Sequence, residues 1–296
     1  MKQADSLRRR SRALRLGSQK LWQLFKRDSA AVYAVTTAAL TFVSSDDLGL
    51  ALPEKLFLMF APAVLSMVLA LVELMVRDVR TVWAQGDGAL ETAYGDLLDV
   101  GEGGESMRVI PVNTTFDTVV DRGGCGDGSP PLVAPGTLHG KWIECALGGA
   151  LTRDELDARI ASSLSGIAPE RILSEKDKPQ GKRKEYGIGT IAPVRIGSVT
   201  YLLVALSAFD NRNIAHSCRE NLIQCVRRVL EYGNGHGQGA DLYIPLMGTG
   251  RSRIQLDHGE ALDVILACCR AHFDLIHGKV TVLIYEGDAD KVSIWR

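Results

Sequence analysis

The chain has 296 residues, a formal net charge of −1 and 46% hydrophobic residues. This composition is typical of a folded globular protein and excludes a disordered one. Residues 1–27 carry nine lysines and arginines against one aspartate, so the remaining chain is mildly acidic, which argues against nucleic acid as a partner. Six cysteines without a C-x-x-C pair predict neither a zinc site nor a disulfide framework, and indicate a reducing compartment.

Two apolar stretches follow the basic segment. Residues 30–43 are apolar but short, whereas residues 56–76 form a long apolar run whose one charge is Glu73. About 20 such residues cross roughly 30 Å of hydrocarbon. The connecting residues include Asp, Gly and Pro, as a polar turn should. We therefore expect a basic cytosolic segment at 1–28 and a transmembrane helical hairpin at 29–77.

The distribution of basic residues predicts the orientation of this hairpin. Basic residues precede it, Arg77 and Arg80 follow it, and the connecting loop has only Lys55. The positive-inside rule then places both termini in the cytoplasm and makes the chain a multi-pass membrane protein. The alternative is a buried helical hairpin in a protein without a membrane span. Glu73 is either a functional intramembrane carboxylate or a residue that reaches the headgroups or Arg77.

After Arg80, apolar strands alternate with helices. The expected strands are RVIPV at 108–112, VTYLLVAL at 199–206, DLYIPL at 241–246 and KVTVLIY at 279–285. A capping box formed by Thr152 and Glu155 opens a helix that runs to about Leu164. Helical spacing of apolar residues also predicts helices at 217–232 and 258–273. The pattern indicates an α/β fold with a mostly parallel sheet covered on both faces, in which ligands bind beyond the carboxyl ends of the strands.

Two of these strand ends carry distinctive residues. The first strand leads into Asn113 and the run T-T-F-D-T, and the third leads into M-G-T-G-R-S-R at 247–253. A glycine loop with free backbone N–H groups and arginines can wrap a diphosphate. A glycine between a strand and a helix can also be purely steric. From this loop alone, anion binding remains one of two interpretations.

The combination of motifs is more specific. G-D-L at 95–97, a strand ending V-N at 112–113 and a strand ending P-x-x-G-x-G at 245–250 resemble the macro domain family over residues 90–296. The run IPVNTTFDTVV followed by GTLHGKWI at 136–143 is similar to the macro-like domain of Thoeris antiphage effectors. The resemblance implies a macro-type α/β fold, with a mixed, mostly parallel sheet flanked by helices, preceded by the transmembrane hairpin.

The resemblance also implies a function. In the membrane-bound version of that family, a partner TIR-domain enzyme makes an ADP-ribose derivative, a histidine adduct, that binds the macro domain. The effector then forms a homo-oligomer and disrupts the lipid bilayer of the bacterial inner membrane. No cofactor and no metal are implied. We expect the same of this chain.

Family roles can be placed on matching positions. The aspartate of G-D-L contacts adenine, the V-N end reaches the distal ribose, and the glycine loop holds the diphosphate. His139 is either a ligand contact or a structural histidine. The resemblance thus implies these ligand-binding residues: Asp96, Leu97, Asn113, Thr114, Phe116, Asp117, His139, Gly140, Lys141, Gly248, Thr249, Gly250, Arg251, Ser252 and Arg253.

The sequence departs from macro-domain hydrolases after V-N. Many of those enzymes continue with A-A-N and a glycine-rich stretch, where this chain has T-T-F-D-T. We therefore expect binding without catalysis. The alternatives are a membrane-anchored ADP-ribose hydrolase and a membrane scaffold with a degenerate macro fold. The lysine-rich run at 176–184 is expected to be a solvated loop that can lie near the phosphates.

Overall fold

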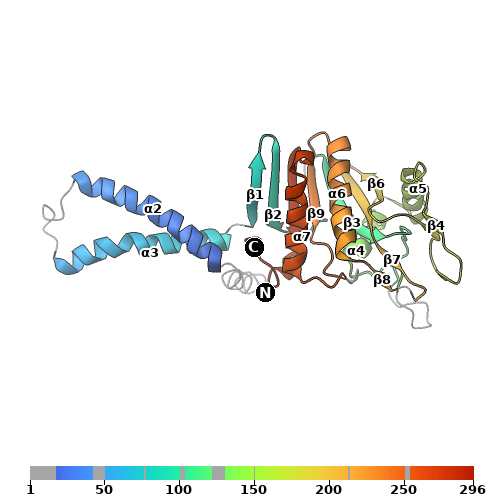
Figure 1. Cartoon of the computed structure of the whole chain (residues 1–296), viewed down its shortest axis with the longest axis horizontal. Helices are drawn as coiled ribbons and strands as arrows, with labels where there is room; N and C mark the ends of the chain where they lie inside the picture. Colours follow the sequence, from blue (N-terminus) through green and yellow to red (C-terminus); the bar gives the residue numbers. More distant parts are fainter. Residues whose placement is uncertain are drawn as a thin grey trace. The chain divides into compact units, whose positions relative to one another are not determined.

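The computed structural model describes residues 18–42, 51–76, 78–100, 104–121, 131–149, 151–212, 214–250 and 254–296. The chain divides into two compact units, one made of Met1–Asp78 with Gly287–Arg296 and the other of Val79–Glu286. Figure 1 shows the helical pair of the first unit and the sheet and helices of the second.

The first unit is built on two helices, α2 (Ser18–Phe42) and α3 (Leu52–Val76). They pack against each other where Leu24 and Ala70 are buried, and Trp295 from the C-terminal segment packs on the same cluster. Arg27 of α2 and Glu73 of α3 form an ion pair at 2.5 Å. Glu73 therefore has a partner in the other helix.

Within the described ranges, no helix is long and apolar enough to cross a membrane. This finding contradicts the predicted transmembrane hairpin and the predicted multi-pass localisation in the bacterial inner membrane. The apolar stretches belong to helices that also carry charge. α2 begins at Ser18 and so includes Arg27 and Asp28, and the carboxylate of Glu73 lies against Arg27. Charged side chains are costly in hydrocarbon.

The second unit is organised around an eight-stranded sheet with the strand order β1-β2-β10-β9-β3-β7-β6, and β8 pairs with β7. The strands are β1 (Val79–Gln85), β2 (Gly88–Tyr94), β3 (Ser106–Asn113), β6 (Ile191–Ile196), β7 (Val199–Phe209), β8 (Ala215–His216), β9 (Asp241–Pro245) and β10 (Gly278–Ile284). A separate two-stranded ribbon joins β4 (Arg171–Ile172) and β5 (Lys184–Glu185). The predicted mixed, mostly parallel sheet is confirmed.

The central strands run parallel. β2 pairs with β10, β10 with β9, β9 with β3 and β3 with β7, all in parallel register. The antiparallel pairs are β1 with β2, β6 with β7 and β7 with β8. The carboxyl ends of the parallel strands therefore meet at one edge of the sheet, which we call the carboxyl edge.

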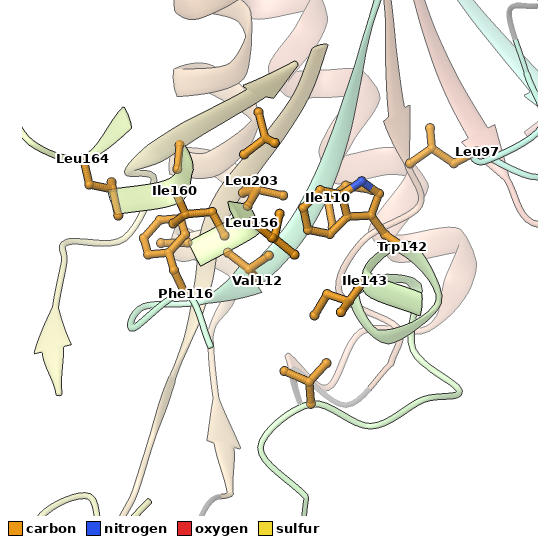
Figure 2. Packing of buried hydrophobic residues seen from close by; sticks show 14 of the residues in the cluster. Leu97, Ile110, Val112, Phe116, Trp142, Ile143, Leu156, Ile160, Leu164 and Leu203 are labelled. Atoms are coloured by element: carbon orange, nitrogen blue, oxygen red, sulfur yellow. The ribbon is translucent and has the colours of Figure 1, made fainter. Parts of the chain in front are cut away.

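Helices cover both faces of this sheet. They are α4 (Leu138–Gly149), α5 (Arg153–Ser163), α6 (Arg219–His236) and α7 (His258–Ala271), with short 3-10 helices at Phe273–Leu275 and Glu286–Asp288. One face of β3 presents Ile110 and Val112 to a cluster that includes Trp142 of α4 and Leu156 of α5 (Figure 2). Figure 1 shows α6 and α7 side by side in front of the sheet.

Local sequence signals account for most of these elements. The predicted capping box is present, because Thr152 accepts a hydrogen bond from the Glu155 backbone and the Glu155 side chain accepts one from Thr152. A second capping box opens α7, formed by Asp257 and Glu260. The strands expected at 108–112, 199–206, 241–246 and 279–285 correspond to β3, β7, β9 and β10. The β1–β2 hairpin, β6 and α4 were not predicted.

Candidate functional site

Four loops that carry predicted site residues, or lie beside them, follow neighbouring strands at the carboxyl edge. Tyr94 at the end of β2 pairs with Ile284 at the end of β10, and Leu283 pairs with Pro245 at the end of β9. β3 ends at Asn113 on the far side of β9. The loops after β2, β10, β9 and β3 therefore stand in a row, as expected for a ligand site of a parallel α/β sheet.

The loop after β2 contains Asp96 and Leu97. One Asp96 carboxylate oxygen accepts a hydrogen bond from the Leu98 N–H at 3.0 Å, and the Leu97 side chain is buried. No described residue engages the second carboxylate oxygen of Asp96, which leaves it as an acceptor for a ligand donor.

The buried side chain of Arg108 on β3 holds the loop after β2 in place. The Nη1 atom of Arg108 on β3 donates to the carbonyls of Leu97 at 3.1 Å and Leu98 at 2.7 Å, and Nη2 donates to the carbonyl of Val100. The guanidinium lies 5.9 Å from the centre of the Tyr201 ring. Sequence reasoning missed Arg108, although an arginine at the start of a strand that is otherwise apolar was a usable signal.

Asn113 ends β3 with its side chain fixed by its own loop. Its Oδ1 atom accepts from the Thr115 N–H at 3.2 Å, the Asp117 N–H at 3.1 Å and lies 3.1 Å from the Thr115 hydroxyl. Two backbone N–H groups can only donate, so the atom they approach is the amide oxygen. The amide nitrogen therefore faces the other way, and no described residue accepts from it.

The same loop contains a buried ion pair. Asp117 and Lys178 are each about 1% exposed at their side chains and contact each other directly. The Lys178 ammonium also donates to the Thr115 hydroxyl at 2.6 Å and to the Lys182 carbonyl at 2.8 Å. Burial lowers the pKa of Lys178, and the neighbouring Asp117 charge opposes that shift.

The lysine-rich run at 176–184 therefore does more than form a solvated loop. Lys178 is fully buried, and Lys182 donates to the carbonyl of Phe116 at 2.8 Å and pairs with Asp157 at 2.5 Å. Gly181 has φ +79°, and a Cβ there would lie 2.3 Å from the Asp117 carboxylate. The run is fastened to the loop after β3, a role that sequence reasoning missed.

Thr114 and Phe116 point into the protein. The Thr114 hydroxyl donates to Glu185 at 3.0 Å. The Phe116 side chain is 1% exposed and meets the Tyr186 ring edge-on, with the ring centres 5.7 Å apart. Figure 2 shows Phe116 in the core cluster with Leu156 and Ile160. Phe116 also has φ +53°, a left-handed conformation that costs a non-glycine residue about 1–2 kcal/mol.

The first turn of α4 holds the next group of predicted residues. Thr137 caps the helix by accepting from the Gly140 N–H at 3.1 Å. A Cβ on Gly140 would lie 2.2 Å from the Ala134 carbonyl oxygen, so this position requires glycine. The Lys141 ammonium lies 4.8 Å from the centre of the Tyr285 ring. Tyr285 directly follows β10 and is exposed, so the structure adds an aromatic ring that sequence reasoning missed.

His139 is buried beside Trp142, with the ring centres 6.4 Å apart. Burial, with a smaller contribution from the charge of Lys182, lowers the pKa of His139 from its ordinary 6.5 to about 3. The ring is therefore neutral at physiological pH. It can offer one donor and one acceptor but not a positive charge.

The loop after β9 contains the predicted diphosphate-binding residues. Gly248 is buried and has φ +96°, a conformation that suits glycine. Gly250 is exposed, and a Cβ there would meet no atom of the described residues within 4 Å. Thr249 lies between them, partly exposed. Arg251, Ser252 and Arg253 lie outside the described residues.

Together these residues can recognise a long polar ligand. From β2 to β3, the carboxyl edge offers a carboxylate oxygen at Asp96, an aromatic ring at Tyr285, a glycine loop at 248–250 and an amide nitrogen at Asn113. In the described part of the chain, no group of three or more His, Cys, Asp or Glu side chains could hold a metal ion.

Comparison with known proteins identifies a family. Residues 90–285 match the family described as Thoeris protein ThsA, Macro domain. The Thoeris protein ThsA of Bacillus amyloliquefaciens is 25% identical over 275 residues, covering 90% of this chain and 85% of that protein.

Solved structures of a macrodomain from Oceanobacillus iheyensis are also similar. The one with MES bound is 15% identical and covers 73% of this chain and 93% of its own, with a TM-score of 0.45. The one with ADP is 15% identical and covers 74% and 94%, with a TM-score of 0.44.

Proposed function

The chain belongs to the Thoeris ThsA macro domain family, and from that premise we propose that it is an antiphage defence effector that binds an ADP-ribose-type nucleotide. The binding site we propose is the carboxyl edge of the sheet in the second unit. The signal comes from a partner TIR-domain enzyme, and a histidine adduct of ADP-ribose is its proposed form. Binding then promotes self-association.

The row of loops at the carboxyl edge is the observation that carries this proposal. Asp96 offers an acceptor for the amino group of adenine, with the Tyr285 ring beside it. The glycine loop after β9 offers backbone N–H groups for a diphosphate, and Asn113 offers a donor for a ribose oxygen. Three strand spacings of about 4.8 Å separate the first loop from the last. The strand order thus matches the order of base, diphosphate and ribose in ADP-ribose.

We further propose that the site binds without turning the ligand over. Hydrolysis needs a group that can take or give a proton near the scissile bond. The Asp117 carboxylate is held in a buried ion pair with Lys178. His139 has a pKa of about 3 and so is neutral, and the Asn113 oxygen is occupied by its own loop. Asp117 and His139 are therefore unsuited to acid–base work, and the neutral amide of Asn113 cannot perform it.

Calorimetry of the full-length protein with ADP-ribose, NAD and histidine-ADP-ribose tests the proposal. We expect binding of the two ADP-ribose compounds, tighter for the histidine adduct, and weaker binding of NAD. Chromatography of the incubated ligands should recover them unchanged, and analytical ultracentrifugation should detect a larger species with the adduct. Absence of binding by either ADP-ribose compound would refute the proposed function, and steady conversion of a bound ligand would support the hydrolase alternative.

A further inference from the structure

We propose that Lys178 is a positioning residue, which holds the side chain of Asn113 with its amide nitrogen directed at the terminal ribose of the ligand. This inference rests on the proposed function, because it assigns the terminal ribose to the end of β3. It also gives a role to a lysine that the sequence places in a charged surface run.

Two short contacts join Lys178 to Asn113 through the Thr115 hydroxyl. The ammonium of Lys178 donates to the Thr115 hydroxyl at 2.6 Å. That hydroxyl lies 3.1 Å from Asn113 Oδ1 and 2.7 Å from Asp117 Oδ2. A hydroxyl has one proton, so it donates to one of these oxygens while it accepts from Lys178. Lys178 therefore fixes the position of the group that borders the Asn113 amide.

Asp117 provides a second connection between Lys178 and Asn113. Its backbone N–H donates to Asn113 Oδ1 at 3.1 Å. Its carboxylate binds Lys178 through one oxygen and the Lys182 N–H, at 2.7 Å, through the other. The backbone and side chain of Asp117 thus connect the lysine-rich loop to the amide oxygen of Asn113.

The orientation of Asn113 has a chemical consequence. Its oxygen is used inside the loop, so only its NH₂ group is available for a ligand. Asn113 can therefore bind an acceptor, such as a ribose hydroxyl or ring oxygen, and cannot accept from a ligand through its occupied oxygen. An ADP-ribose compound presents such an oxygen on a second ribose beyond the diphosphate, whereas ADP has only the ribose joined to adenine and ends at the diphosphate.

A buried ion pair contributes little net free energy to the stability of a loop, because the cost of desolvating the two charges offsets much of their attraction. Apolar side chains in place of Lys178 and Asp117 would stabilise the core equally well, but they would not orient the Asn113 amide. Gly181 shows that the backbone is also fitted to the pair, since any side chain there would clash with the Asp117 carboxylate. These features indicate that the Lys178–Asp117 pair serves to position the side chain of Asn113.

The test is calorimetry of the full-length protein with ADP and with ADP-ribose. Thr115→Val removes the bridging hydroxyl with little change in shape, and the double variant Lys178→Met with Asp117→Asn removes both charges. Lys176→Met, an exposed lysine in the same run, is the matched control. Thermal unfolding of each variant checks that it is folded. If the double variant fails to fold, Thr115→Val carries the test.

We expect the wild type and Lys176→Met to prefer ADP-ribose over ADP. Thr115→Val and the double variant should reduce that preference by about three- to tenfold, which is the worth of one hydrogen bond, and leave ADP affinity unchanged. A general loss of structure would weaken both ligands equally. A wild type that binds neither ligand refutes the proposed function and this inference together. A wild-type preference that Thr115→Val fully retains, or a wild type that binds both ligands equally, overturns only the positioning role.

Discussion

The loops after β3 and β9 lie at the same edge of one sheet, yet they are built in opposite ways. After β3, the side chains of Thr114, Thr115 and Asp117 bond to Glu185 or Lys178, in other parts of the chain. After β9, no described residue hydrogen-bonds to the side chain of Thr249, and no described atom lies within 4 Å of a Cβ built on Gly250.

This difference indicates that the two loops have different roles in ligand binding. A loop whose polar groups are already satisfied presents a fixed shape, and so suits discrimination between ligands. A loop whose polar groups are free gains its hydrogen bonds from the ligand, and so suits affinity. Substitutions in the loop after β3 should therefore change stability and the preference between ligands, whereas substitutions in the loop after β9 should change affinity.

The largest expected effect is on stability, in the loop after β3. Lys178→Met leaves the Asp117 carboxylate buried without its partner, so the free energy of unfolding should fall by about 3–5 kcal/mol. Urea denaturation followed by tryptophan fluorescence measures it. Lys176→Met is the control and should be nearly neutral. A loss below about 1 kcal/mol for Lys178→Met would mean that the pair does not stabilise this loop.

The next effect is on binding, in the loop after β9. Gly250→Asp places a carboxylate where the diphosphate is proposed to bind, and should weaken ADP-ribose affinity by about ten- to a hundredfold. Its thermal stability should stay unchanged, because the added side chain meets open space.

The matched control for this variant is Gly235→Asp. Gly235 is also exposed with open space around it, but it lies near the end of α6, on the side where β9 begins. Calorimetry should show wild-type affinity for this control. Equal weakening by both variants would reflect net charge alone, and no weakening by either would place the diphosphate elsewhere.

A third prediction concerns His139, which is buried next to Trp142. Because burial lowers the pKa of His139 to about 3, folding favours its neutral form. Its contribution to stability is therefore fully present above about pH 6.5 and is lost as the pH falls towards 3. At pH 5 the loss amounts to about 2 kcal/mol.

Proton NMR of the histidine ring signals checks this directly. One signal should stay at its neutral position from pH 7.5 to pH 5, and that signal should be missing from His139→Gln. If the signal lost in His139→Gln is one that shifts across this range, the His139 ring takes up a proton in the folded protein and is not shielded from solvent.

The smallest effect compares the same substitution in both loops. Thr114→Val removes a buried hydrogen bond to Glu185 and should cost about 1 kcal/mol of unfolding free energy. Thr249→Val removes none among the described residues and should change stability by less than about 0.5 kcal/mol. Chemical denaturation of the two variants side by side measures both. Equal losses of unfolding free energy in the two variants would contradict the proposed difference between the loops.

Much of the fold follows from local sequence patterns. The continuous apolar runs that became β3, β7, β9 and β10 are typical of strands buried on both faces, and the Thr152–Glu155 capping box marked the start of α5. The β1–β2 hairpin was missed although Q-G-D-G at 85–88 is a turn signal. α4 was missed because Gly140, Gly148 and Gly149 weaken its helical pattern.

The site was harder to predict, because its key contacts join distant parts of the chain. Lys178 sits among charged residues, and such runs are usually solvated. Its burial depends on Asp117, which lies 61 residues away in sequence. Arg108 likewise reaches back to carbonyls of the loop after β2. No local pattern specifies such partners. In the first unit, apolar content suggested membrane spans, whereas pairing such as Arg27 with Glu73 became visible only in three dimensions.

The position of the chain ends of the second unit has a mechanical consequence. Val79, where the chain enters, pairs with Ala93 near the end of β2, and Ile284, where it is about to leave, pairs with Tyr94. Both covalent links to the helical pair thus depart from the carboxyl edge. A ligand that moved Tyr285 would act two peptide bonds from Gly287, the first residue after the second unit. The proposed ligand site and both covalent links of the second unit thus lie at the same edge of the sheet.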